Sequence, residues 1–78
     1  MNLENFNNIY NAINRSNYIY IHDFDIYNSI IFVWHGGKII NIYDMNFKAI
    51  DCFTSMHKIN ITDVKQLIDD HIKENYNN

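Results

Sequence analysis

Residues 29–44 read SIIFVWHGGKIINIYD, and this stretch decides the fold. Both halves are rich in β-branched and aromatic residues, which are typical of strands. Gly36 and Gly37 lie between the halves and tolerate the positive φ that a tight hairpin turn requires. The sequence therefore predicts an antiparallel hairpin with strands over Ser29–His35 and Lys38–Asp44.

A two-residue turn at this point predicts a register that pairs His35 with Lys38 and Trp34 with Ile39. Side chains alternate along strands, so this register separates two faces of the sheet. The predicted aliphatic face holds Ile31, Val33, Ile40 and Ile42, together with Ile50 and Cys52 from a following strand. The predicted aromatic face holds Ile30, Phe32, Trp34, Ile39, Asn41 and Tyr43, together with Ala49, Asp51 and Phe53.

Two further strands flank the hairpin. Tyr18–Phe24 (YIYIHDF) precedes it and has the same β-branched and aromatic composition. The residues Asp44–Phe47 have turn chemistry, because Asp and Asn tolerate left-handed backbone and hydrogen-bond to nearby N–H groups. Lys48–Phe53 (KAIDCF) then predicts a short fourth strand. The central part of the chain is thus a three- to four-stranded antiparallel meander.

Amphipathic helices are predicted on both sides of the meander. Apolar residues recur at helical spacing over about residues 3–15, where Asn2 can cap the first turn. Thr62 is the predicted cap of a second helix that runs to about Asn75, with Val64, Leu67, Ile68 and Ile72 on one apolar stripe. The tail 76–78 is expected to fray. The predicted fold class is α+β, with the order α-β-β-β-β-α and two layers in which both helices cover one face.

Composition places this chain among globular domains. It has 78 residues, of which 47% are apolar, and a formal net charge of −3. Such a length forms one domain, residues 1–78. The first residues lack the basic start and apolar run of a signal peptide, and no stretch is long enough to span a bilayer. We therefore expect a cytoplasmic protein that does not bind membranes.

Metal and catalytic chemistry is not predicted. The four histidines are His22, His35, His57 and His71, and neither they nor Cys52 follow a metal-ligand spacing. His71 continues the apolar stripe of the second helix and is interpreted as a half-buried core histidine. Asp23 and Asp25 could act as paired carboxylates, although a solvated strand end with two charges is far more frequent. We expect no enzyme activity, no catalytic residues and no cofactor.

An aromatic sheet face that one layer of helices leaves uncovered predicts a protein-binding surface. Acidic residues at strand ends and turns accompany it, and this combination suits a basic partner such as a nucleic-acid-handling protein. The candidate partner-binding residues are Tyr20, Asp23, Asp25, Tyr27, Phe32, Trp34, Tyr43, Asp44 and Asp51.

Three alternatives remain open at this stage. The aromatic face could stack nucleic-acid bases, but the six basic residues are dispersed and outnumbered by nine acidic ones, which disfavours direct binding. It could be the interface of a homodimer. It could also be covered internally, with one helix on each face of the sheet.

Residues 39–53, IINIYDMNFKAIDCF, are similar to a hairpin found in small accessory proteins of phages and mobile elements. The helix–meander–helix order and the size resemble those of several anti-CRISPR proteins. This resemblance implies a stoichiometric inhibitor that binds a CRISPR effector and blocks target DNA binding or cleavage in the host cytoplasm. The chain departs from the most acidic, DNA-mimicking members, because its net charge of −3 is mild.

Overall fold

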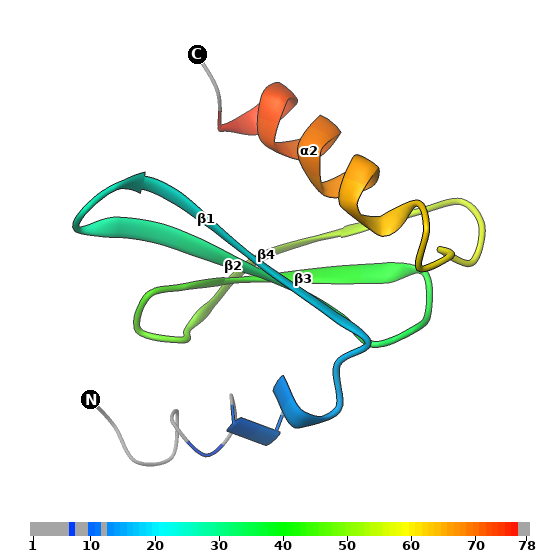
Figure 1. Ribbon diagram of the computed structural model, residues 1–78, viewed down its shortest axis with the longest axis horizontal. Coiled ribbons are helices and arrows are strands. Elements are labelled where there is room, and N and C mark those ends of the chain that lie inside the picture. The colour runs from blue at the N-terminus through cyan, green and yellow to red at the C-terminus, as the bar shows by residue number, and fades with distance from the viewer. Residues whose placement is uncertain (1–6, 8–9, 12, 77–78) are drawn as a thin grey trace.

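The computed structural model describes residue 7, residues 10–11 and residues 13–76. These residues form an α+β domain with a four-stranded antiparallel sheet in the order β1-β2-β3-β4, followed by helix α2 (Figure 1). The strands are β1 (Tyr18–Asp25), β2 (Asn28–Trp34), β3 (Ile39–Asp44) and β4 (Ala49–Thr54), and the helix is α2 (Val64–Asn75). The predicted meander is confirmed, with four strands.

Helix α2 crosses one face of the sheet, and its apolar stripe packs into the core on that side (Figure 1). Val64, Ile68 and Ile72 are buried at the helical spacing that the sequence predicted. They meet side chains from β2 and β3, and the whole core cluster comprises Ile30, Phe32, Trp34, Ile40, Ile42, Ile59, Val64, Ile68 and Ile72. One continuous apolar layer therefore joins the helix to the sheet.

The predicted register of the β2–β3 hairpin is wrong by one residue. Trp34 pairs with Ile40, so five residues (35–39) separate the paired residues and the Gly-Gly pair lies among them. The indole Nε1 of Trp34 donates a hydrogen bond to the Gly37 carbonyl at 2.9 Å, and Gly36 takes a φ of +99°. These interactions stabilise a wider turn than the two-residue turn that glycine alone suggests.

This one-residue shift moves every β3 side chain to the opposite face. Ile40 and Ile42 lie beside Phe32 and Trp34 under α2, while Asn41 and Tyr43 lie on the other face. The two predicted faces are therefore not observed. Cys52, predicted to face the core, pairs with Asn41 and is exposed.

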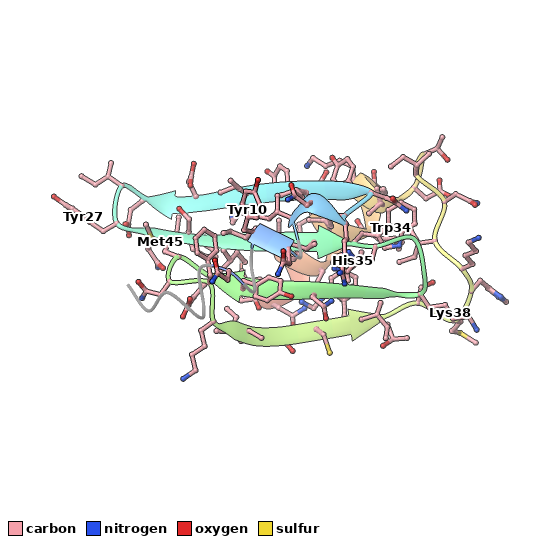
Figure 2. All side chains as sticks on the ribbon, turned by 90° about the horizontal axis from the view of Figure 1, so that it is seen from below. Tyr10, Tyr27, Trp34, His35, Lys38 and Met45 are labelled. Atoms are coloured by element: carbon pink, nitrogen blue, oxygen red, sulfur yellow. The ribbon has the colours of Figure 1, made fainter. Side chains whose placement is uncertain are left out.

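The face opposite α2 is also partly covered. Val33 is 1% exposed and Ile31 is 8% exposed, although both point away from the helix. The described residues that precede β1 lie on this face, and Figure 2 shows Tyr10 in front of the sheet when it is seen from that side. The helix predicted over about residues 3–15, and with it the prediction that both helices share one face, falls largely outside the described residues.

The ends of α2 differ from their predictions in small ways. The residue at the N-cap position is Asp63, not Thr62, and its side chain makes no capping hydrogen bond. Tyr76 was expected to fray, but its N–H donates to the Ile72 carbonyl and its ring lies 5.9 Å from the ring of Phe24. This contact connects the end of α2 to β1. Within the described residues, no helix has the length and apolar character needed to cross a membrane.

Candidate functional site

The β1–β2 turn presents the most exposed apolar side chains of the hairpin. Ile26 is 83% exposed and Tyr27 is 82% exposed at its tip. The Asp25 carboxylate holds the turn by accepting the Tyr27 N–H at 2.7 Å, and the Asp23 carboxylate accepts the Ser29 hydroxyl. Local hydrogen bonds to acidic side chains therefore fix a turn whose apolar residues point into solvent.

The β3–β4 turn is built in the same way. The Asp44 carboxylate accepts the N–H groups of Asn46 and Lys48, both at 2.9 Å. Phe47 takes the left-handed backbone with a φ of 66°, which closes the turn. Met45 is left 48% exposed at its tip. The predicted turn chemistry at Asp44 is confirmed, although Phe47, rather than an Asp or Asn, adopts the left-handed conformation.

These two turns lie at the same end of the sheet, which we call the turn end (residues 23–29 and 44–50). Ile30, near the start of β2, pairs with Asp44 at the end of β3, so the β1–β2 turn before Ile30 and the β3–β4 turn after Asp44 are neighbours. Figure 2 shows Tyr27 and Met45 at one end of the molecule and Trp34, His35 and Lys38 at the other. A shallow groove of about 380 Å³ runs between the turns and is lined by Tyr27, Asn28, Ser29, Ile30, Asp44, Met45, Asn46 and Ile50.

Charge is distributed unevenly between the two ends of the sheet. The turn end carries three aspartates, Asp23, Asp25 and Asp44, and one lysine, Lys48. At the opposite end, the Lys38 carbonyl accepts the Ser55 N–H and the Gly37 carbonyl accepts the Ile59 N–H. These bonds hold the β2–β3 turn against the β4–α2 loop, which brings together a segment with His35 and Lys38 and one with His57 and Lys58. The turn end is therefore acidic and its opposite end is basic.

The structure brings together four of the nine predicted site residues. Asp23, Asp25, Tyr27 and Asp44 all lie at the turn end. Phe32 and Trp34 do not belong to any surface, because α2 buries them to 0% and 4% exposure. The alternative in which a helix covers the aromatic residues internally is the one observed for these two side chains.

The other three predicted residues lie apart from the turn end. Tyr20 is half-buried beneath α2, where the Lys65 ammonium lies 3.9 Å from the centre of its ring. Asp51 lies on the α2 face opposite Ile42, and Tyr43 lies on the other face of the sheet. A single aromatic surface that includes all nine residues is therefore not observed.

Two ionisable side chains of the α2 layer have shifted pKa values. Burial raises the pKa of the Tyr76 hydroxyl, and the charge and hydrogen bond of Asp51 add to that shift. The hydrogen bond to Asp69 raises the pKa of the Lys65 ammonium, with the charge of Asp69 acting in the same direction. The first interaction joins the end of α2 to β4, and the second stabilises an exposed turn of the helix.

The sequence did not identify Ile26 and Met45 as site residues. Both are apolar residues within turns, between Asp25 and Tyr27 in one case and between Asp44 and Asn46 in the other. An apolar residue inside a predicted turn has no core to enter, and this local signal could have found them. With Tyr27, they give the turn end an apolar centre surrounded by carboxylates, as in many protein interfaces.

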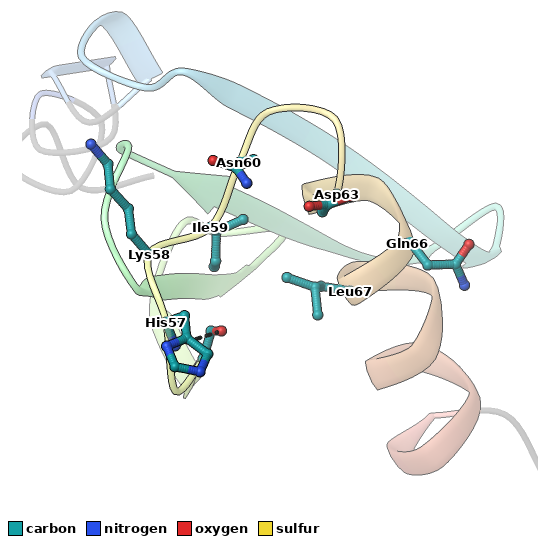
Figure 3. A pocket seen from close by; sticks show the side chains of 8 residues that line it. His57, Lys58, Ile59, Asn60, Asp63, Gln66 and Leu67 are labelled. Carbon is teal, nitrogen blue, oxygen red and sulfur yellow. Dashed lines mark hydrogen bonds between the residues drawn. The ribbon is translucent and has the colours of Figure 1, made fainter.

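A second hollow, of about 450 Å³, lies between the β4–α2 loop and α2 (Figure 3). It is lined by Ser55, His57, Lys58, Ile59, Asn60, Asp63, Gln66 and Leu67. Figure 3 shows the side chains of His57 and Lys58 diverging from one another rather than meeting across the hollow. These two basic side chains therefore do not meet at one point within the hollow.

Among the residues that the structure describes, no group of three His, Cys, Asp or Glu side chains is placed to hold a metal ion. His71 is half-buried, as predicted, with its ring stacked on Phe53 at a centroid distance of 4.1 Å. The chain matches none of the protein-family models, curated proteins or solved structures with which it was compared.

Proposed function

We propose that this protein binds another protein through the turn end and acts without catalysing a reaction. The observation that carries the proposal is the gathering of Ile26, Tyr27 and Met45, all largely exposed, among the carboxylates of Asp23 and Asp44. Exposed aromatic and Met side chains are enriched at interface centres. Carboxylates around such a centre favour a basic partner and speed its association.

The first partner to test is a CRISPR effector, which the resemblance of residues 39–53 to phage accessory proteins suggests. Such effectors hold nucleic acid in a positively charged channel, and a small acidic surface with an apolar centre can compete for that channel. The proposed activity is then stoichiometric inhibition of target DNA binding or cleavage. Direct nucleic-acid binding through stacked bases is not favoured, because Phe32 and Trp34 are buried beneath α2.

The experiment combines affinity capture with an inhibition assay. Tagged protein is used to capture partners from a bacterial lysate with and without nuclease treatment, and is then titrated into purified, guide-loaded CRISPR effectors during DNA cleavage. A captured effector that survives nuclease treatment and is inhibited at about equimolar protein supports the proposal. Recovery of nucleic acid alone, or cleavage unaffected in every effector of the panel, contradicts it.

Matched variants locate the surface. Tyr27→Ala and Asp44→Asn should each weaken binding, the second without removing the side-chain oxygen that accepts the turn N–H groups. Met56→Ala and Asp63→Asn are the controls. Met56 is 87% exposed in the β4–α2 loop, and Asp63 makes no side-chain capping bond. If the two control variants lose as much binding affinity as the two test variants, the binding surface lies elsewhere.

A further inference from the structure

The two edges of the sheet differ in how their backbone groups are used. β1 and β4 are the edge strands, since the order is β1-β2-β3-β4. An edge strand offers unpaired N–H and C=O groups to any extended chain, and proteins protect such edges with bulges, Lys, Pro or side-chain contacts. Only an unprotected edge is open to a further strand.

The β4 edge is protected at its centre. The Ser55 N–H donates to the Lys38 carbonyl, so the alternation of the antiparallel ladder directs the N–H of Cys52 away from β3. That outward N–H donates at 2.8 Å to the carboxylate of the preceding residue, Asp51. The register of β3 and β4 is also irregular between Ile42 and Tyr43. An added strand would have to displace the carboxylate and follow the irregularity.

Among the described residues, neither a hydrogen-bonded carboxylate nor an irregular register protects the β1 edge along most of its length. Carrying the same alternation across β3 and β2 directs the backbone groups of Ile19 and Ile21 outward from the sheet. The strand contains no Pro, Lys or Arg, and its register is regular from Tyr18 to Asp23. The side chains of Ile19 and Ile21 are 36% and 56% exposed beside this edge.

We propose that the β1 edge pairs antiparallel with β1 of a second copy, which joins the two sheets into one of eight strands. This inference goes beyond the proposed function and involves a different part of the surface, since the tips at Tyr27 and Met45 are not needed for it. A two-fold axis relates the copies, so each contact occurs twice.

The apolar pattern selects the register. If Tyr20 faces Tyr20 of the second copy, then Ile19 lies opposite Ile21, so both residues with outward backbone groups meet an isoleucine. The alternative with Ile21 facing Ile21 would place the carboxylate of Asp23 opposite Ile19. The apolar pairs therefore favour the register centred on Tyr20.

Sedimentation equilibrium over a range of concentrations tests the proposal. The wild-type protein should dimerise, and Ile21→Lys should weaken the dimer at least about tenfold, because it places ammonium groups beside the isoleucines of the second copy. Ile39→Lys is the control, since Ile39 is 50% exposed on the same face but belongs to an inner strand. Circular dichroism verifies that both variants are folded.

A wild-type protein that stays monomeric at all concentrations overturns the inference, as does a dimer that Ile21→Lys leaves intact. Loss of dimerisation with intact effector binding, or the reverse, separates this inference from the proposed function.

Discussion

Replacing Trp34 with Ala distinguishes a core role for this residue from a binding role. Trp34 is 4% exposed, packs in the cluster beneath α2, and donates its indole N–H to the Gly37 carbonyl at 2.9 Å. Truncating a buried Trp to Ala costs about 3–5 kcal/mol, part of it from the cavity that remains. A domain of 78 residues has a total unfolding free energy of about 4–12 kcal/mol. The variant should therefore lose a large fraction of its stability.

Urea unfolding followed by circular dichroism measures this loss, with Tyr27→Ala as the control. Tyr27 is 82% exposed, so its truncation should change the unfolding free energy by less than about 0.5 kcal/mol. Trp34 is the only tryptophan, so acrylamide quenching of wild-type fluorescence reports its accessibility directly. Rapid quenching, together with an unfolding free energy for Trp34→Ala within about 1 kcal/mol of wild type, would refute a buried Trp34 and the register described above.

Two further predictions concern the α2 layer. His71→Phe should raise the unfolding free energy by about 1 kcal/mol, because the ring still stacks on Phe53 while a buried Nε2 that lacks a hydrogen-bond partner among the described residues is removed. A lower urea midpoint for this variant would contradict that explanation. Burial and Asp51 raise the pKa of Tyr76 above its ordinary value of 10.0, so the folded state holds this proton more tightly than the unfolded state does. The resulting stability is present below about pH 10 and is lost as the pH rises beyond it, and Tyr76→Phe should lack this alkaline loss in urea midpoints measured from about pH 8 to 11. The shift at Lys65 has the same sign, so the difference between wild type and variant isolates Tyr76, and parallel pH profiles would rule out its contribution.

The elements were predictable because local patterns determine them. Alternating β-branched residues gave four strands to within one or two residues at each end, and the spacing of Val64, Ile68 and Ile72 gave the buried stripe of α2. The carboxylate of Asp44 closed its turn as expected, because an Asp side chain reaches the N–H groups that follow it in the chain. These features depend on neighbours in sequence.

The register of the β2–β3 hairpin depends on an interaction that the pattern of apolar residues does not reveal. A Gly-Gly pair permits both a two-residue turn and a wider one, and both leave apolar residues on each face of the hairpin. The hydrogen bond from the Trp34 indole to Gly37 stabilises the wider turn, and the helix stripe can then pack on Phe32 and Ile40 together. Sequence identified the apolar residues correctly but could not decide which face the helix would cover.

Because the sequence does not decide which face the helix covers, the candidate site was predicted on a sheet face, whereas the structure places it at the ends of the strands. Once α2 covers Phe32 and Trp34, the exposed apolar side chains that remain next to acids are those of the two turns, Ile26, Tyr27 and Met45 among them. Whether a turn side chain is exposed depends on what surrounds it in space as well as on its neighbours in sequence. Asp23, Asp25, Tyr27 and Asp44 were identified for their chemistry, and the structure supplies the common position that sequence could not.

The two proposed surfaces together predict the stoichiometry of the complex with a partner. Antiparallel pairing of β1 with a second copy places the Asp25 end of one strand beside the Tyr18 end of the other, so the two turn ends point away from each other along the shared sheet. Neither tip is covered, and a dimer of this kind can hold one partner at each turn end. A dimer formed through Ile26 and Tyr27 would instead bury the surface that a partner needs, and binding and dimerisation would then compete. A complex with two partners for each dimer is thus the arrangement that accommodates both surfaces.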